Sequence, residues 1–407
     1  MTSLRLSTFL AGRSLARSNY GIAAATTLMM LLIYISLLFL PSLIQGAVNR
    51  VNTALVNTLT SNIVITPAAD NSAANNSAIE NAGSYLDQIR KTAGVAAATG
   101  VYRVGTQVSY GANSGSWTVD AIDPASYGQV FTTPRNLIEG RGLTSGDTTK
   151  VLLGIGIAGA GQRGVHGYKA SLQTVHAGDH VGITLASGKS VTFTVAGIFN
   201  DQFNPADGNA YITQAEAQKL VPASAGRATA IYVRTSRGTT DSQEVSRLSK
   251  LRGGLKFQTS ADLGAAVQDQ TASYQLISDI LKFISLVMAA ITIFTITYID
   301  LVSKRRQIGI ERAIGIRSGP IVLSYVLKAW AYALAGVGTG FVLFRFAVTP
   351  LVHSHPFRFP NGPVTLATTW NEMSRDLIVL LIVATLAALA PAVRSVRIRI
   401  LDAIWGT

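Results

Sequence analysis

Two glycine-rich segments have residue types that could bind a phosphate or a nucleotide. LASGKS at 185–190 matches the end of a phosphate-binding loop, G-x-x-x-x-G-K-S, but Ile183 stands where the first glycine of that pattern belongs. The residues after it, SVTFTVAGI, predict a strand, whereas a phosphate loop leads into a helix. The sequence therefore favours a hairpin turn at Ser187-Gly188.

The second segment runs from Gly154 to Gly159 and fits the G-x-G-x-x-G pattern of dinucleotide-binding folds. Asp179 follows about twenty residues later, the spacing at which an acidic residue contacts a ribose in such folds. The alternation of parallel strands and helices that these folds require does not continue along the chain. We interpret the segment as a strand that runs into a helix of small residues.

Histidine is the only other side chain here whose chemistry suggests a site. His353 and His355 are separated by one residue in a Pro-rich and aromatic stretch, so a metal or haem contact is one interpretation and two solvated imidazoles of a surface loop is the other. The surface loop is favoured. The chain has no cysteine, which excludes disulfides and thiolate metal sites. We expect no catalytic, metal or cofactor site in this chain.

The composition is that of a membrane protein. Hydrophobic residues make up 48% of the 407 residues and charged residues only 14%, because four long apolar stretches interrupt the chain. The first apolar run of about 24 residues is too long for a signal peptide, whose apolar region has roughly 7 to 15. We expect transmembrane helices at 20–46, 271–302 (including an outer stalk), 320–348 and 375–393.

The long stretch 47–270 differs from the rest of the chain. Polar residues, glycine and short alternating runs such as Val191, Phe193 and Val195 predict half-buried strands, with helices between them. The Ala/Asn/Ser-rich stretch Pro67–Ser84 predicts a mobile loop. The fold class expected is a four-helix membrane protein with a mixed α/β extracytoplasmic domain of about 220 residues, large enough for its own core.

The basic residues give the orientation. Segments 1–19, 303–319 and 394–407 hold eleven Lys and Arg, whereas the loop 349–374 holds one. Positive residues gather on the cytoplasmic side of membrane proteins. We therefore expect an interfacial helix at 1–19, a loop at 303–319 and a tail at 394–407 in the cytoplasm, with 47–270 outside. The net charge of +13 is explained in this way, and nucleic acid is not an expected partner.

Charged residues inside the expected spans need partners, because an unpaired charge there costs about 2.5–3.5 kcal/mol on insertion scales. Lys328 lies at a depth from which it could reach Asp300 near the inner end of the second span. Arg345, near the outer end of the third span, could pair with Glu372 or Asp376, or reach the lipid headgroups.

The loop 303–319 carries the most specific pattern in the chain. Its sequence SKRRQIGIERAIGIRSG is strongly basic, and Ile308, Glu311, Arg312 and Gly315 share one face if it is helical. Attraction to anionic membrane lipids is one interpretation. The other is a helix that docks on a cytosolic partner, with apolar anchors and charges that fix its orientation.

RRQIGIERAIGIRSGPI resembles the coupling-helix signature of the MacB/FtsX-like (LolCE-type, type VII) ABC transporter permeases. Five segments between NIVITPAA and VHAGDHVGITLASGKSVTFTVAGIF are similar, in order, to the periplasmic core domain of that family. PAVRSVRIRILDAI is similar to the family's ending, with Leu401-Asp402 in place of Pro-Glu. The resemblance covers most of the chain.

The resemblance implies a permease subunit that converts closure of a separate cytosolic ABC ATPase into movement of the outer domain, a process called mechanotransmission. ATP and Mg²⁺ would be bound by that ATPase. A second permease copy, identical or related, membrane lipids and an extracytoplasmic adaptor are the other partners implied. The alternative is an FtsX-like signalling protein that regulates a cell-wall hydrolase without transport. The residues implied in ATPase coupling are Arg305, Arg306, Ile308, Gly309, Ile310, Glu311, Arg312, Ala313, Ile314 and Gly315.

Overall fold

The computed structural model describes residues 3–16, 20–68, 78–159, 171–359 and 362–396. The chain divides into two compact units. A helical unit comprises Met1–Val48, Thr271–Phe357 and Val364–Thr407, and an α/β unit comprises Asn49–Gln270 and Arg358–Pro363.

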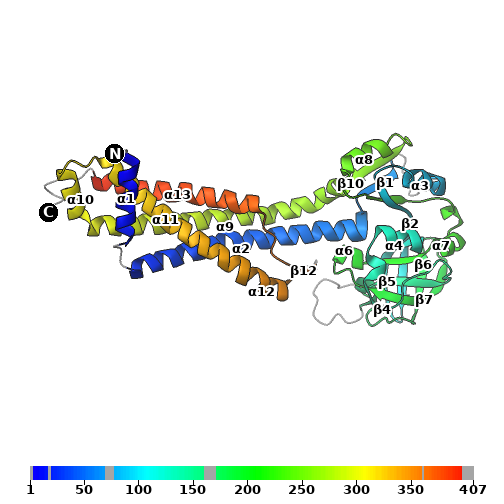
Figure 1. Ribbon diagram of the computed structural model, residues 1–407. Helices are drawn as coiled ribbons and strands as arrows, with labels where there is room; N and C mark the ends of the chain where they lie inside the picture. Colours follow the sequence, from blue (N-terminus) through cyan, green and yellow to red (C-terminus); the bar gives the residue numbers. More distant parts are fainter. Residues whose placement is uncertain (1–2, 17–19, 69–77, 160–170, 360–361, 397–407) are drawn as a thin grey trace. The chain divides into compact units, whose positions relative to one another are not determined.

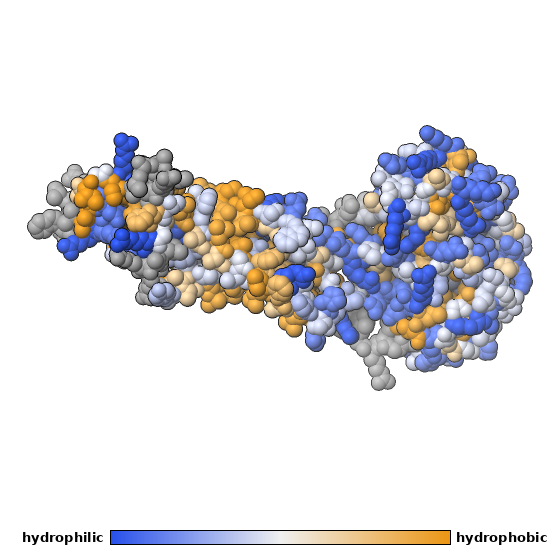
Figure 2. Space-filling model, viewed as in Figure 1, coloured by the Kyte–Doolittle hydropathy of each residue, from blue (hydrophilic) through white to orange (hydrophobic). Residues whose placement is uncertain are grey.

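Four helices in the described residues are long and apolar enough to cross a membrane, as the sequence predicted. Within the helical unit their apolar stretches lie side by side (Figure 1) and form a largely hydrophobic surface (Figure 2). Two of them continue at their C-terminal ends as five-residue π-helical turns. The four are α2 (Tyr20–Leu55), α9 (Ser260–Ser303), α11 (Ser318–Leu343) and α13 (Trp370–Val396).

Small residues on α11 let it approach α2 closely. A Cβ atom added to Gly336 would lie 2.3 Å from the Cβ of Met30, and one added to Gly340 would lie 3.1 Å from the ring of Tyr34. Without a hydrophobic driving force between helices in lipid, such close backbone packing is a main source of association. Ala333, one turn from Gly336, is fully buried in the same core.

Shorter elements complete the helical unit and the connections. The helix α1 (Ser3–Ala16) packs on α11, and α10 (Arg305–Ala313) separates α9 from α11. The stretch 349–374, expected as a loop, contains α12 (Thr349–Ser354), the strands β11 (Phe357–Phe359) and β12 (Gly362–Val364), and the first turn of α13.

The α/β unit is built on one mixed sheet in the order β10-β1-β9-β2-β3-β8-β5-β7-β4, with β6 paired to β2 and β7. The predicted strand SVTFTVAGI lies within β7. The strands are β1 (Ile63–Pro67), β2 (Val95–Tyr110), β3 (Asn113–Ile122), β4 (Leu137–Gly140), β5 (Lys150–Gly154), β6 (His180–Leu185), β7 (Ser190–Phe199), β8 (Asn209–Thr213), β9 (Ala230–Thr235) and β10 (Leu255–Thr259).

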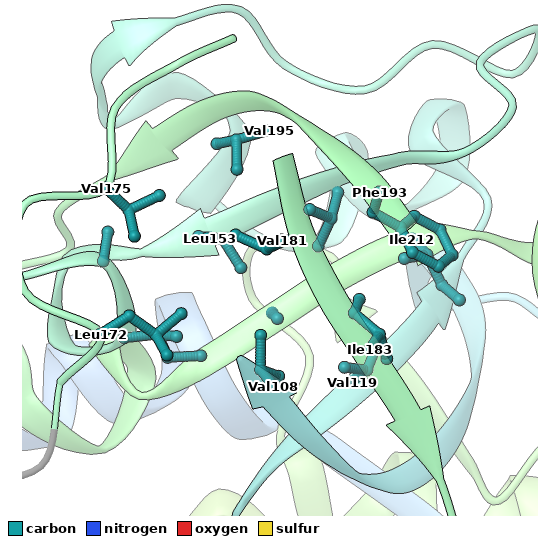
Figure 3. Packing of buried hydrophobic residues seen from close by; sticks show 14 of the residues in the cluster. Val108, Val119, Leu153, Leu172, Val175, Val181, Ile183, Phe193, Val195 and Ile212 are labelled. Atoms are coloured by element: carbon teal, nitrogen blue, oxygen red, sulfur yellow. The ribbon is translucent and has the colours of Figure 1, made fainter. Parts of the chain in front are cut away.

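Apolar side chains from alternate positions of these strands form the core. Phe193 and Val195 on β7 are fully buried, and Figure 3 shows them packed with residues of neighbouring strands. Short helices flank the sheet, namely α3 (Ala82–Arg90), α4 (Pro124–Val130), α5 (Ile155–Ala158), α6 (Asn204–Asp207), α7 (Gln214–Leu220) and α8 (Asp241–Leu248), with 3₁₀ turns at Thr133–Arg135 and Pro222–Ser224.

The glycine-rich segments have the local structures predicted for them. LASGKS is the turn of the antiparallel β6–β7 hairpin, with Gly188 at φ 82°. The Gly154 segment is the end of β5 followed by the four-residue helix α5.

The expected loop Pro67–Ser84 is shorter than predicted. Pro67 ends β1, and α3 already begins at Ala82 because the next turns bury Tyr85 and Ile89 against the sheet. Ile79 pairs with Ala228 in an isolated bridge. Residues 69–77 lie outside the described residues.

Candidate functional site

The predicted coupling stretch forms a helix that ends earlier than expected. α10 stops at Ala313, and Gly315 adopts φ 94°. The N–H of Gly315 donates to the carbonyl of Arg312 at 3.1 Å, and the N–H of Ile316 donates to that of Glu311 at 3.1 Å. This is a Schellman C-terminal cap, in which glycine is favoured because it tolerates positive φ. Gly315 therefore ends the helix and does not belong to the predicted face.

One side of α10 packs into the helical unit. Ile308 is only 4% exposed and lies in a cluster with Leu301 of α9, Tyr325 of α11 and Val396 of α13. Gly309 beside it is also buried. Ile308 was expected among the residues that couple to the ATPase; it is buried here and joins α10 to the ends of three long helices.

The opposite side of α10 is open. Ile310 is 48% exposed and Ile314 is 73% exposed, which is high for isoleucine. Arg306 and Ala313 are exposed on the same side. Glu311, half-buried, accepts a hydrogen bond from Gln307 Nε2 at 2.9 Å. The remaining residues of the predicted set, Arg305 and Arg312, are half-buried.

Asp300 connects α10 to the long helices. Lys328 Nζ of α11 lies 2.8 Å from Asp300 Oδ2, and Lys304 Nζ lies 3.2 Å from Oδ1. The Lys328 ammonium also lies 5.9 Å from the centre of the Tyr332 ring. The predicted pairing of Asp300 with Lys328 is thus present, and Lys304 adds a second cation that the sequence interpretation did not name.

A cavity of about 120 Å³ lies beneath α10. Leu10 and Arg13 of α1 form part of its wall. The other lining residues come from the junction just described and are Lys304, Gln307, Ile308, Glu311, Ser324, Tyr325 and Lys328. Three elements therefore meet around one partly polar space at this end of the unit.

Arg345 does not pair as predicted. It is exposed within the π-helical turn Phe344–Val348 and, within the described residues, forms no ion pair. Glu372 Oε2 instead accepts from the N–H of Thr369 at 3.1 Å, at the start of α13. Asp376 lies 3.8 Å from Lys282 of α9, so neither carboxylate faces Arg345.

The other residues considered from the sequence show no arrangement for catalysis. His353 is exposed on α12, and His355 Nδ1 lies 3.0 Å from Ser354 Oγ. Across the described ranges, no group of three or more His, Cys, Asp or Glu residues could hold a metal ion.

Two of the carboxylates in the α/β unit whose pKa is perturbed, those of Asp147 and Asp201, stabilise loops. Hydrogen bonds from the Arg141 guanidinium, at 2.7 and 2.8 Å, hold the pKa of Asp147 well below its usual range. Burial raises the pKa of Asp201, although it accepts hydrogen bonds from Thr133 Oγ1 at 2.7 Å and Asn136 Nδ2 at 2.6 Å. Since both side chains are saturated by neighbouring loops, neither is arranged as a general base.

Two ion pairs of the helical unit were not predicted from the sequence. Lys304 lies four residues after Asp300, a spacing that places two side chains on one helix face, so this pair could have been found. The pair Lys282–Asp376 joins α9 to α13, which are far apart in the chain. Finding it requires knowing which helices are neighbours.

Comparison with known proteins gives two family matches. Residues 23–251 match the MacB-like periplasmic core domain, and residues 280–400 match the FtsX-like permease C-terminal family. The chain is 31% identical over 128 residues to "Macrolide export ATP-binding/permease protein MacB" of Hahella chejuensis, covering 30% of this chain and 19% of the relative. It is 30% identical over 104 residues to the protein of that name from Escherichia coli K12, covering 25% of this chain and 16% of the relative.

Among solved structures, the periplasmic region of MacB from Actinobacillus actinomycetemcomitans is similar to this chain with a TM-score of 0.38 and 16% identity, covering 53% of this chain and 95% of that region. The curated relatives are matched over less than a fifth of their own length.

The structure has four helices of spanning length in its described residues. The match to the periplasmic core domain covers more than half of the chain. Together these features define a membrane permease. The second match covers α9 from residue 280 onward together with α10, α11 and α13. The chain belongs to the MacB/FtsX-like family of ABC transporter permeases.

Proposed function

We propose that this chain is the permease subunit of an ABC transporter that works by mechanotransmission. ATP and Mg²⁺ would be bound by a separate cytosolic ATPase, and closure of that ATPase would push α10. In this orientation α1, α10 and both termini face the cytoplasm, and the α/β unit lies outside. The basic residues around α10 support this orientation.

The observation that carries the proposal is the two-sided character of α10. Its inner side is fixed to α9, α11 and α13 through Ile308, and its N-terminal end is held by the Asp300 ion pairs. Its outer side presents Ile310 and Ile314 to solvent. A helix that is fixed on one side and apolar on the other can transmit a push without bending, since packed interiors are poorly compressible.

The names of the matched relatives favour transport over the FtsX-like signalling alternative. Two of them are described as macrolide export ATP-binding/permease proteins, so macrolides are the first compounds to test as substrates. We propose that the permease acts as a dimer with an identical or related copy, and that the substrate is captured from the outer leaflet or the extracytoplasmic space.

Ile314→Asp tests the docking surface directly. It should remove ATPase co-purification from detergent-solubilised membranes, because a charge replaces an apolar anchor at the interface. Ile314→Leu, which keeps the anchor, should behave as the unmodified chain. Ser318→Asp is the charge-matched control, because it adds the same negative charge at an exposed position four residues away, at the start of α11.

Attraction of this surface to anionic lipid predicts a different result, since it depends on net charge. Ile314→Asp and Ser318→Asp would then be equally impaired, and Glu311→Arg would keep or gain function. Docking predicts that Glu311→Arg impairs permease-stimulated ATP hydrolysis. If Ile314→Asp and Glu311→Arg both retain the ATPase and its activity, the proposed coupling role of α10 is wrong.

A further inference from the structure

A second cavity, of about 350 Å³, lies among α2, α9 and α13. On α9 the lining residues recur at helical spacing at positions 275, 278, 279 and 282, so they form one polar face. On α13 the cavity is lined by Glu372, Arg375 and Asp376, and on α2 by an apolar wall. The wall consists of Leu37, Leu38, Pro41 and Ile44, next to Ser42 and Gln45.

The ion pair in this cavity is incompletely satisfied. Lys282 Nζ and Asp376 Oδ2 are 3.8 Å apart, and their side chains are only 18% and 9% exposed. This separation exceeds a hydrogen bond. Neither side chain makes a hydrogen bond to any other residue that the structure describes. Polar groups with little exposure nearly always have hydrogen-bond partners, so this pair has donor and acceptor capacity left for a polar group bound in the cavity.

The position of the pair along the helices places the cavity at one boundary of the membrane. Lys282 precedes the end of α9 at Ser303 by 21 residues, which is about 32 Å of helix. Asp376 precedes the end of α13 at Val396 by 20 residues, or about 30 Å. The hydrocarbon layer is about 30 Å thick. The cavity is therefore at headgroup level, at the opposite end of the helices from α10.

The charges around the cavity are of both signs. Asp279, Glu372 and Asp376 oppose Lys282 and Arg375, so the formal charge is −1. An anionic lipid would meet one more carboxylate than cations. A headgroup with both an ammonium and a phosphate would satisfy both kinds of side chain, and its glycerol and acyl chains would lie on the apolar wall of α2. The volume lies in the range of small-molecule sites.

We propose that this cavity binds the headgroup of a phospholipid that carries a primary amine, such as phosphatidylethanolamine. The ammonium lies between Asp376 and Glu372, and the phosphate contacts Lys282 and Arg375. A primary ammonium donates up to three hydrogen bonds to carboxylates, whereas the quaternary ammonium of choline donates none. The inference goes beyond the proposed coupling role, and only the assignment of the site to the outer leaflet depends on the proposed orientation.

The test is titration of the purified, delipidated full chain with defined lipids, read by native mass spectrometry. Phosphatidylethanolamine should bind about tenfold more tightly than phosphatidylcholine or phosphatidylglycerol, a difference of about 1.4 kcal/mol. Asp376→Asn should abolish this preference. Asp87→Asn, which removes a carboxylate whose side chain is 67% exposed in the α/β unit, should leave it unchanged.

A second variant keeps every charge in place. Ser278 is buried and lines the cavity, so Ser278→Leu should fill the space and exclude the headgroup even if Asp376→Asn does not fold. Gel filtration and thermal unfolding establish that each variant is folded. The proposal is overturned if the unmodified chain shows no preference for phosphatidylethanolamine, or if folded Ser278→Leu retains it.

Soluble phosphoethanolamine distinguishes the lipid from a free amino phosphate. It should bind at least tenfold more weakly than the lipid, because it lacks the apolar part that the α2 wall holds. Equal binding of phosphoethanolamine and the lipid would assign the cavity to soluble amino phosphates and overturn the lipid assignment.

Discussion

Removal of Asp300 and removal of Lys328 should have unequal costs. Lys328 is 5% exposed, whereas the side chain of Asp300 is 19% exposed and has Lys304 as a second partner at 3.2 Å. Asp300→Asn leaves the buried ammonium of Lys328 without this carboxylate. Lys328→Met leaves Asp300 next to Lys304.

The expected magnitudes follow from this geometry. Breaking a buried ion pair by removing one partner costs about 3–5 kcal/mol, so we expect about 3 kcal/mol for Asp300→Asn. For Lys328→Met we expect about 1 kcal/mol, because a carboxylate that keeps an exposed partner is partly compensated. The double variant removes both charges and should cost about 1–2 kcal/mol, which corresponds to a coupling energy of about 2–3 kcal/mol.

The assay is unfolding of the full chain in mixed micelles with increasing sodium dodecyl sulfate, followed by the fluorescence of its four Trp residues. Lys304→Met serves as the comparison, since Lys304 is the more exposed cation, at 24%. Equal costs for Asp300→Asn and Lys328→Met, or strict additivity in the double variant, would refute the reasoning that Lys328 depends on Asp300 at this depth.

Four further predictions concern other parts of the chain. Gly336→Leu should destabilise the helical unit by about 1–3 kcal/mol, measured by the same unfolding assay, because its side chain would overlap Met30; Gly338→Leu, where nothing lies within 4 Å, is the control. Asp147→Asn should increase hydrogen exchange of the Arg141 loop at pH 7, and the difference should shrink as the pH falls below about 4, since a carboxyl group with a lowered pKa contributes its full stability above the ordinary pKa and loses it progressively below that value. The pKa of Asp201 is raised, so the folded state favours its protonated form. The contribution of Asp201 to the free energy of unfolding should therefore increase as the pH falls, opposite to that of Asp147. A cysteine introduced at Ser187, which is exposed in the β6–β7 turn of this cysteine-free chain, should react with an impermeant reagent on whole cells, and one at Ile314, which is 73% exposed, should not; the reverse result would contradict the orientation.

Patterns along the chain were sufficient to predict several of the strands, but not β4, β8 or β10, and the pairing of Asp300 with Lys328. Alternation of apolar residues specifies which side of a strand is buried, as for Phe193 and Val195. Asp300 and Lys328 lie on helices joined by the short α10 connection, so their depths could be matched by counting residues.

The errors have physical reasons as well. Helical periodicity predicted which residues of α10 share a face, but not which face packs inward, so the burial of Ile308 against the long helices was not foreseen. Gly315 was placed on that face, although glycine just after a basic last turn is also a signal for the end of a helix. Arg345 was matched to carboxylates by depth alone, whereas Asp376 pairs with Lys282 on a helix that is not its sequence neighbour.

The two ion pairs between long helices have a consequence for biogenesis. Asp300 on α9 meets Lys328 on α11, and Lys282 on α9 meets Asp376 on α13. A single span that enters the bilayer with an unpaired charge is penalised by about 2.5–3.5 kcal/mol. α9 and α11 therefore gain from leaving the translocation machinery together as a hairpin. Lys282, at headgroup level, can wait for its counter-ion until α13 has been synthesised.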